Sequence, residues 1–68
     1  MTEQEVIDRL KAAVDVAGGQ RAFARAHGIS VGYVNDVLRG KRALSDRVLA
    51  TIGIRRQILH IVTYHEDV

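Results

Sequence analysis

Apolar residues recur at helical spacing along the first part of the chain, and glycines interrupt the pattern. Within residues 2–17, the apolar positions spaced three or four residues apart are Val6, Leu10, Ala13, Val14 and Ala17. Residues at this spacing share one face of a helix, so this stripe is expected to face a core. Thr2 and Glu5 stand three residues apart, as in a capping box, where a hydroxyl and a carboxylate bind backbone N–H groups at the start of a helix.

Two shorter helices are predicted between residues 20 and 39. Gly18 and Gly19 break the first helix, and Gly28 ends the second one, because glycine adopts a left-handed backbone without steric cost. Ser30 can cap a third helix. The inward positions of that helix are Val34, Val37 and Leu38. A three-residue turn is too short for antiparallel packing, so the two helices should cross steeply and leave the outer face of the later one free.

The segment from Gln20 to Arg39 resembles the helix-turn-helix of the phage Cro and repressor family, also called the XRE type. The resemblance is carried by Ala24 where the helices come closest, Gly28 at the turn, and Val34 and Val37 on the inner face of the second helix. The segment covers about a third of the 68 residues. The resemblance implies a DNA-binding domain whose second helix enters the major groove. The alternative is a helical hairpin in which Gly28 is only a C-cap.

A fourth helix and one strand are expected after the helix-turn-helix. Ser45 fits the N-cap of the helix and Gly53 its end. Residues of about 55–64 are dense in β-branched and aromatic side chains, which is typical of a strand, although a continuing helix is the alternative. The expected fold is therefore mainly α: one domain over residues 1–68, with four helices, a helix-turn-helix at 20–39 and a C-terminal strand.

The predicted strand is expected to join two copies of the chain. No other stretch of the sequence is typical of a strand, so its backbone N–H and C=O groups would lack partners within the chain. Antiparallel pairing with the same strand of a second copy, about a two-fold axis near His60, would satisfy them. Phage Cro proteins are similar, because they join subunits through a C-terminal strand. The expected interface residues of the homodimer are Ile58, Leu59, His60, Ile61, Val62 and Tyr64.

Charge is segregated along the chain. Residues 21–56 contain eight Arg and Lys residues against two Asp residues, a net +6, whereas the remainder contains two basic and six acidic residues, a net −4, which together give the overall +2. A basic block over the helix-turn-helix suits phosphate contact, because each neutralised phosphate releases counterions. The resemblance implies that Gln20 and the loop after the third helix also contact phosphate. The residues expected to contact DNA phosphates are Gln20, Arg21, Arg39, Lys41 and Arg42.

The outer face of the helix after the turn is expected to read DNA bases. Val31 can pack on a thymine methyl group, Asn35 can pair with adenine, and Asp36 can accept from the cytosine amino group. The residues expected to contact bases are Ser30, Val31, Gly32, Tyr33, Asn35 and Asp36. Other members of the family often carry Gln or Lys where this sequence has Val31, Gly32 and Asp36, so no operator sequence is transferred from them.

Other chemistries find little support in the sequence. The chain contains no Cys, which excludes disulfides, thiol catalysis and Cys-based zinc sites. Its three His residues have no carboxylate or thiol partners at ligand spacing, and no nucleophile stands with a base and an orienting group. We therefore expect no metal, no cofactor, no small-molecule ligand and no enzyme activity. No apolar run is long enough to span a membrane, and the expected location is the cytoplasm, with the nucleoid of a bacterial host.

Together these features predict a sequence-specific transcriptional regulator that binds double-stranded DNA. The resemblance implies a Cro-like phage or prophage repressor, which binds a palindromic operator as a homodimer. One alternative is an antitoxin-like or accessory protein-binding module with secondary DNA binding. Another is a purely structural dimerisation module, which would have no salt-dependent affinity for DNA.

Overall fold

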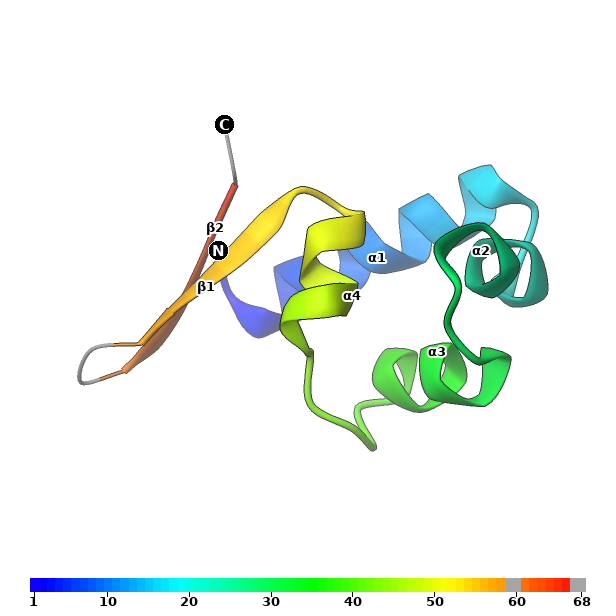
Figure 1. The fold of residues 1–68 in the computed structure, drawn as a ribbon. Helices are drawn as coiled ribbons and strands as arrows, with labels where there is room; N and C mark the ends of the chain where they lie inside the picture. The colour runs from blue at the N-terminus through cyan, green and yellow to red at the C-terminus, as the bar shows by residue number, and fades with distance from the viewer. Residues whose placement is uncertain (59–60, 67–68) are drawn as a thin grey trace.

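The structure is a computed structural model, and it describes residues 1–58 and 61–66 of the 68-residue chain. In these residues four α-helices precede a two-stranded antiparallel hairpin. The elements are α1 (Glu3–Ala17), α2 (Gln20–His27), α3 (Val31–Leu38), α4 (Asp46–Thr51), β1 (Ile54–Ile58) and β2 (Val62–Glu66). The hairpin projects from one end of the helical body, and α2 and α3 lie at the other end (Figure 1). Among the described residues, no helix is both long and apolar enough to cross a membrane.

Three helices begin at the side chains predicted to cap them. The Thr2 hydroxyl accepts the N–H of Glu5 over 3.1 Å, and the N–H of Thr2 donates to Oε1 of Glu5 over 3.2 Å, which completes the capping box. The hydrogen bond from the Thr2 backbone to the carboxylate, and then the Thr2 side chain, hold the pKa of Glu5 below its ordinary value of 4.5. Ser30 and Ser45 cap α3 and α4, each accepting the N–H group three residues later.

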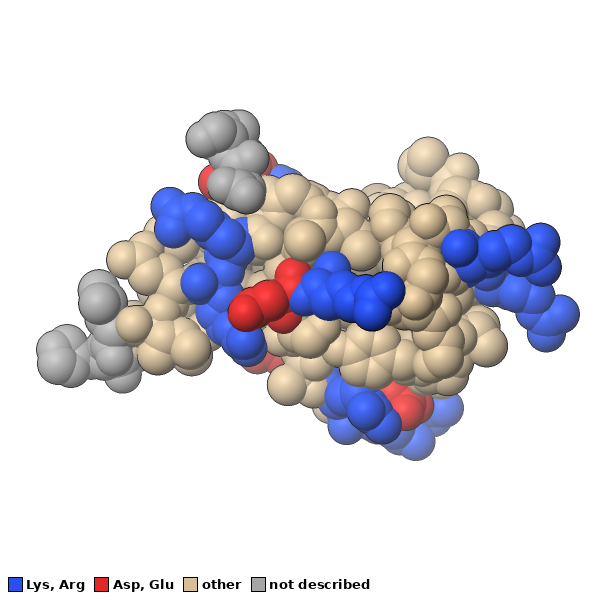
Figure 2. All heavy atoms as spheres, viewed as in Figure 1, with Lys and Arg blue, Asp and Glu red and all other residues tan. Residues whose placement is uncertain are grey.

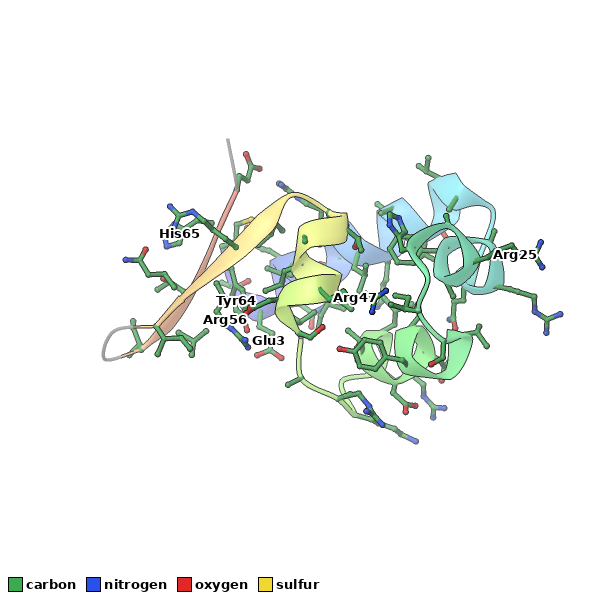
Figure 3. The ribbon with its side chains drawn as sticks, in the orientation of Figure 1. Glu3, Arg25, Arg47, Arg56, Tyr64 and His65 are labelled. Carbon is green, nitrogen blue, oxygen red and sulfur yellow. The ribbon has the colours of Figure 1, made fainter. Side chains whose placement is uncertain are left out.

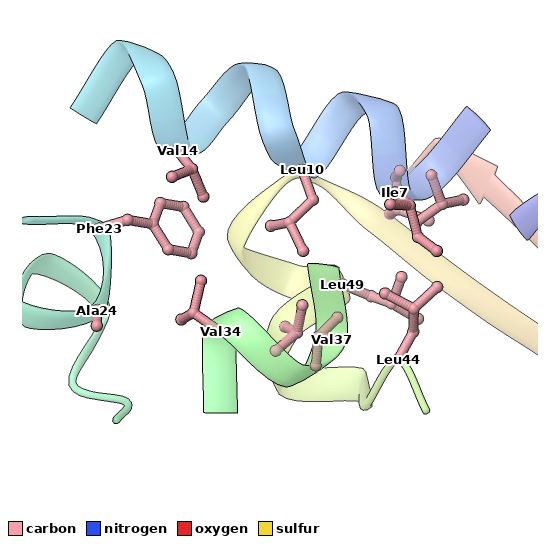
Figure 4. Packing of buried hydrophobic residues seen from close by; sticks show 12 residues of the cluster. Ile7, Leu10, Val14, Phe23, Ala24, Val34, Val37, Leu44 and Leu49 are labelled. Atoms are coloured by element: carbon pink, nitrogen blue, oxygen red, sulfur yellow. The ribbon is translucent and has the colours of Figure 1, made fainter. Parts of the chain in front are cut away.

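One apolar core joins the four helices to the start of β1. Its buried residues are Val6, Ile7, Leu10, Val14, Phe23, Ala24, Val34, Val37, Leu44, Val48, Leu49 and Ile54. The ring of Phe23 lies between Val14 of α1 and Val34 of α3 (Figure 4). No polar or charged side chain is buried among the described residues. Apolar burial is therefore the main stabilising contribution of this core.

The buried face of α1 differs slightly from the predicted stripe. Ile7 is buried with the other core residues of this helix, although the predicted stripe omits it. Ala13 is only partly buried, and Ala17 is exposed. Ala17 lies in the last turn of α1, one turn past Val14, where contact with the core ends.

The C-terminal segment is a hairpin and not the single strand predicted for residues 55–64. β1 pairs antiparallel with β2 in a register that sets Ile58 opposite Val62. The backbone groups that a lone strand would leave unpaired therefore find partners within the same chain. Residues 54–58 and 62–66 therefore do not form the one continuous strand that was expected to pair with a second copy. Leu59 and His60 themselves lie outside the described residues.

One face of the hairpin packs on the helices and then continues past them. Alternate residues of a strand share a face, so Ile54, Ile58, Val62 and Tyr64 lie on the same side of the sheet. Ile54 is 3% exposed and Tyr64 is partly buried, whereas Ile58 is 65% and Val62 48% exposed. Ile61, between the strands, is 71% exposed. We call Ile58, Ile61 and Val62 the apolar tip.

Polar contacts fix the hairpin to the helical body. Arg56 donates from Nη1 to the carbonyl of Leu44 over 3.1 Å and from Nη2 to Oδ1 of Asp46 over 3.0 Å. Arg9 of α1 forms an ion pair with Glu66 of β2. Arg56 belongs to the basic block of the sequence, but its contacts serve the fold.

Candidate nucleic-acid interface

The turn between α2 and α3 has the geometry predicted from the sequence. Gly28 adopts a left-handed backbone with a φ of 66°, and the N–H of Ile29 donates to the carbonyl of Ala24 over 3.0 Å, as at a glycine-terminated helix end. Ala24 is 3% exposed, so it permits close packing beside the turn. Ser30 is extended, with φ −78° and ψ 148°, and begins α3.

The third helix buries one side and exposes the other. Val34 and Val37 are each 1% exposed, as predicted for the inner face. On the other side Val31 is 43% exposed, and Ser30 and Gly32 are exposed as well. The N-terminal half of α3 is therefore the part that a partner can reach.

The fold explains the presence of Ser30, which caps α3, but not that of Gly32. The oxygen of Ser30 accepts the N–H of Tyr33 over 3.1 Å, which leaves the hydroxyl proton to donate elsewhere. Apart from its chain neighbours and the backbone of α3, a side-chain carbon added at Gly32 would meet no atom within 4 Å. Glycine weakens a helix by about 1 kcal/mol relative to alanine. Because a larger side chain would find room at this position, packing within the chain does not account for Gly32.

Asn35 is turned toward α2. Its Nδ2 group donates to Oε1 of Gln20 over 3.2 Å, and this contact is partly buried. The structure therefore brings together a predicted base-reading residue and a predicted phosphate-contacting residue. Asp36, the next residue of α3, is also only partly exposed.

Tyr33 and Arg42 are in contact on the opposite flank of α3. The Cζ atom of Arg42 lies 5.3 Å from the centroid of the Tyr33 ring, within the range of a cation–π interaction. The ring is partly buried against the core, so it holds Arg42 beside the exposed half of α3. An open hollow of about 650 Å³ adjoins this pair and is lined by Gly28, Ile29, Ser30, Gly32, Tyr33, Asp36, Arg42, Ser45 and Arg47.

Polar residues also gather where α2 begins and α3 ends. Gly19, the N-cap of α2, supplies no side-chain hydrogen bond, so the N–H groups of the first turn are available to an anion. Gln20 and Arg39 border an open hollow of about 560 Å³. Lys11 and Asp15 of α1 border it too. From the helical spacing of α1, Lys11 is expected on its solvated face. Nothing in the sequence indicates that Lys11 lies near residues of α2 and α3.

The basic block of the sequence is divided in the structure. Arg21 and Lys41 are exposed, and Lys and Arg side chains gather over the end of α3 and the following loop, at the lower edge of Figure 2. Arg47 instead extends from α4 toward the turn between α2 and α3 (Figure 3), where it donates to the carbonyl of Gly28 over 3.0 Å. Arg47, although exposed, and Arg56 therefore bind within the chain, and the sequence does not distinguish them from Arg21 and Lys41.

Within residues 1–58 and 61–66, no group of three or more His, Cys, Asp or Glu side chains could hold a metal ion. Comparison of the chain with protein-family models, with curated proteins and with solved structures finds no match.

Proposed function

We propose that this chain is a sequence-specific double-stranded DNA-binding transcriptional regulator of the Cro-like type, with α3 as its recognition helix. One observation supports this most strongly: polar or basic residues lie on both flanks of α3. Gln20 and Arg39 lie on one flank, and Arg42, on the ring of Tyr33, lies on the other. A helix in a major groove runs between two phosphate backbones, which this arrangement suits.

The exposed residues of α3 offer varied contacts to base edges. Val31 can pack on a thymine methyl group, Ser30 can donate its free hydroxyl proton to an acceptor, and Asp36 can accept from a cytosine amino group. Gly32 has no side chain to hold the helix away from the groove. Asn35 can pair with adenine, and a good bidentate pair of this kind discriminates between bases by about 1–3 kcal/mol.

We further propose that the chain acts as a homodimer on a palindromic operator. The apolar tip supports this, because clustered exposed apolar side chains mark contact surfaces, and contact between two tips replaces the strand pairing expected from the sequence. The tip lies at the end of the molecule opposite α2 and α3 (Figure 1). Half-sites are about 34 Å apart, and the 35 Å length of the chain is compatible with that spacing if the two copies meet at an angle.

A protein-binding module is the second candidate, and one feature favours it. An open hollow of about 450 Å³ between α1, α2 and α4 is lined mostly by apolar residues: Arg9, Ala12, Ala13, Val16, Ala17, Phe23, His27, Thr51 and Ile52. Val16 is 90% exposed. A partner helix could cover this surface without contact with α3.

Binding of a fluorescently labelled DNA duplex at several salt concentrations tests the proposal. If Arg21, Arg39, Lys41 and Arg42 each neutralise one phosphate, the logarithm of affinity should fall with the logarithm of salt at a slope of about −3.6 per copy. Arg55, on the exposed outward face of β1, gives a matched control, because Arg55→Ala should leave the slope unchanged. A folded protein without affinity for DNA at low salt would refute the proposal.

A further inference from the structure

Arg47 joins α4 to the turn that precedes α3, and the two segments are 19 residues apart in the sequence. Its Nη2 group donates to the carbonyl of Gly28 over 3.0 Å and to that of His27 over 3.5 Å. Figure 3 shows the side chain extending from α4 toward this turn. One guanidinium group therefore holds two carbonyls at the end of α2.

The contact suits the chemistry of a helix end. Carbonyls there lack N–H partners within the helix and lie at the negative end of its dipole, so a guanidinium can form charge-assisted hydrogen bonds with them. The φ of 66° favours glycine at position 28, and Nη2 of Arg47 lies 3.4 Å from the place that a Cβ would take there. The guanidinium therefore lies directly against the turn.

The fourth helix gives Arg47 a fixed support. Val48 and Leu49, the next residues along α4, are 1% and 0% exposed. Ser45 caps the helix through the N–H of Val48. Because the core fixes the backbone of α4, Arg47 fixes the turn relative to the core.

We propose that Arg47 is a positioning residue that sets the direction in which α3 leaves the turn, and thereby the sequence preference of DNA binding. This inference rests on the proposed function. α3 begins three residues after Gly28 and has only eight residues, so a small rotation at its start moves Val31 and Asn35 away from base edges. Phosphate contacts carry no sequence information and tolerate such a change better. Loss of the Arg47 contact should therefore lower affinity for a preferred sequence more than affinity for unrelated DNA.

Three variants test the role of Arg47. Arg47→Met keeps the aliphatic stem and removes the donors, and Arg47→Lys keeps the charge but loses the planar fork. Arg55→Met is the matched control, because the side chain of Arg55 makes no hydrogen bond or ion pair among the described residues. For each protein, affinity is measured for the duplex that the unmodified chain enriches from a random pool and for a scrambled duplex. Amide hydrogen exchange at Ile29, whose N–H binds Ala24, reports on the turn without DNA.

Arg47→Met should lower affinity for the enriched duplex about tenfold, with a loss of only about two- to threefold for the scrambled one, and should speed exchange at Ile29. For Arg47→Lys, the affinity for the enriched duplex should lie between that of the unmodified protein and that of Arg47→Met, so this variant keeps the test valid if the Met variant does not fold. Arg55→Met should leave the ratio of the two affinities unchanged. Equal losses on both duplexes, or unchanged exchange at Ile29, would overturn the inference. An unmodified protein that does not distinguish the two duplexes would instead refute the proposed function.

Discussion

Asn35 of α3 donates a hydrogen bond from Nδ2 to Oε1 of Gln20, the first residue of α2, over 3.2 Å. Each amide group has two N–H donors and a carbonyl with two lone pairs, so both side chains keep groups that can meet DNA. Under the proposed function, the bond links a residue that reads bases to a residue that contacts phosphate. Base reading and phosphate contact should then be energetically coupled.

Single and double substitutions of this pair test the coupling. Asn35→Ala should change preference at one base position by about 1–3 kcal/mol and change binding to unrelated DNA less. With Gln20→Ala added, the combined loss should differ from the sum of the single losses by about 0.5 kcal/mol or more, because the two side chains are in contact. Affinities for duplexes that differ at single base pairs measure both effects. Additive losses would mean that the side chains act independently, and a uniform loss from Asn35→Ala would remove its base-reading role.

Replacing Lys41 and Arg42 together by Ala should weaken binding to all DNA sequences alike. Both side chains are exposed beside α3, and phosphate contacts fix register without reading sequence. The slope of log affinity against log salt should become shallower by about 1.8 for two lost contacts. Anisotropy titrations over a range of salt measure the slope, and an unchanged value would exclude the phosphate role of this loop.

Charges at the apolar tip should separate the two copies. Ile58 and Ile61 are 65% and 71% exposed, so Ile58→Asp with Ile61→Asp should leave the fold intact and disfavour an apolar interface by burying charge. Sedimentation velocity should then report monomers. Gln57→Asp, a charge on the neighbouring exposed position, is the control and should stay dimeric. A dimer that survives the double substitution would place the interface elsewhere.

The capping box of α1 should be visible in the titration of Glu5. Hydrogen bonds from the Thr2 backbone and with the Thr2 side chain lower the pKa of Glu5 below 4.5. The ionised carboxylate therefore favours the fold above the unfolded-state pKa, and this contribution is lost as the pH falls through the lower folded-state pKa. Thr2→Ala should raise the pKa of Glu5 toward 4.5, as measured by NMR titration of its carboxyl carbon. No change in this pKa would mean that the Thr2 side chain does not help to keep the carboxyl of Glu5 ionised, and that the bond from the Thr2 backbone alone lowers its pKa.

Local chemistry makes the helices of this chain predictable from its sequence. A capping serine such as Ser30 or Ser45 needs only a backbone N–H three residues away, and Gly28 needs only its own backbone freedom. These signals lie within a few residues of the feature that they specify. The helix boundaries and the turn between α2 and α3 follow from them.

The hairpin is harder to predict because its connection has no usual turn residue. Hairpins are indicated by Gly, Asn, Asp or Pro between two strand-like runs, and residues 58–62 contain none of these. A run of β-branched residues without such a signal is typical of one continuous strand. The contact of Arg47 with the turn and the position of Lys11 near α2 and α3 are not predictable either, because both depend on segments that are distant in sequence.

Selection of bound sequences from a random duplex pool at moderate salt tests most directly whether α3 reads DNA bases within a dimer. The expected result is an enriched palindrome whose half-sites lie one helical turn apart, about 10–10.5 base pairs from centre to centre. Recovery of no motif by the folded protein would contradict sequence-specific binding and favour the protein-binding candidate.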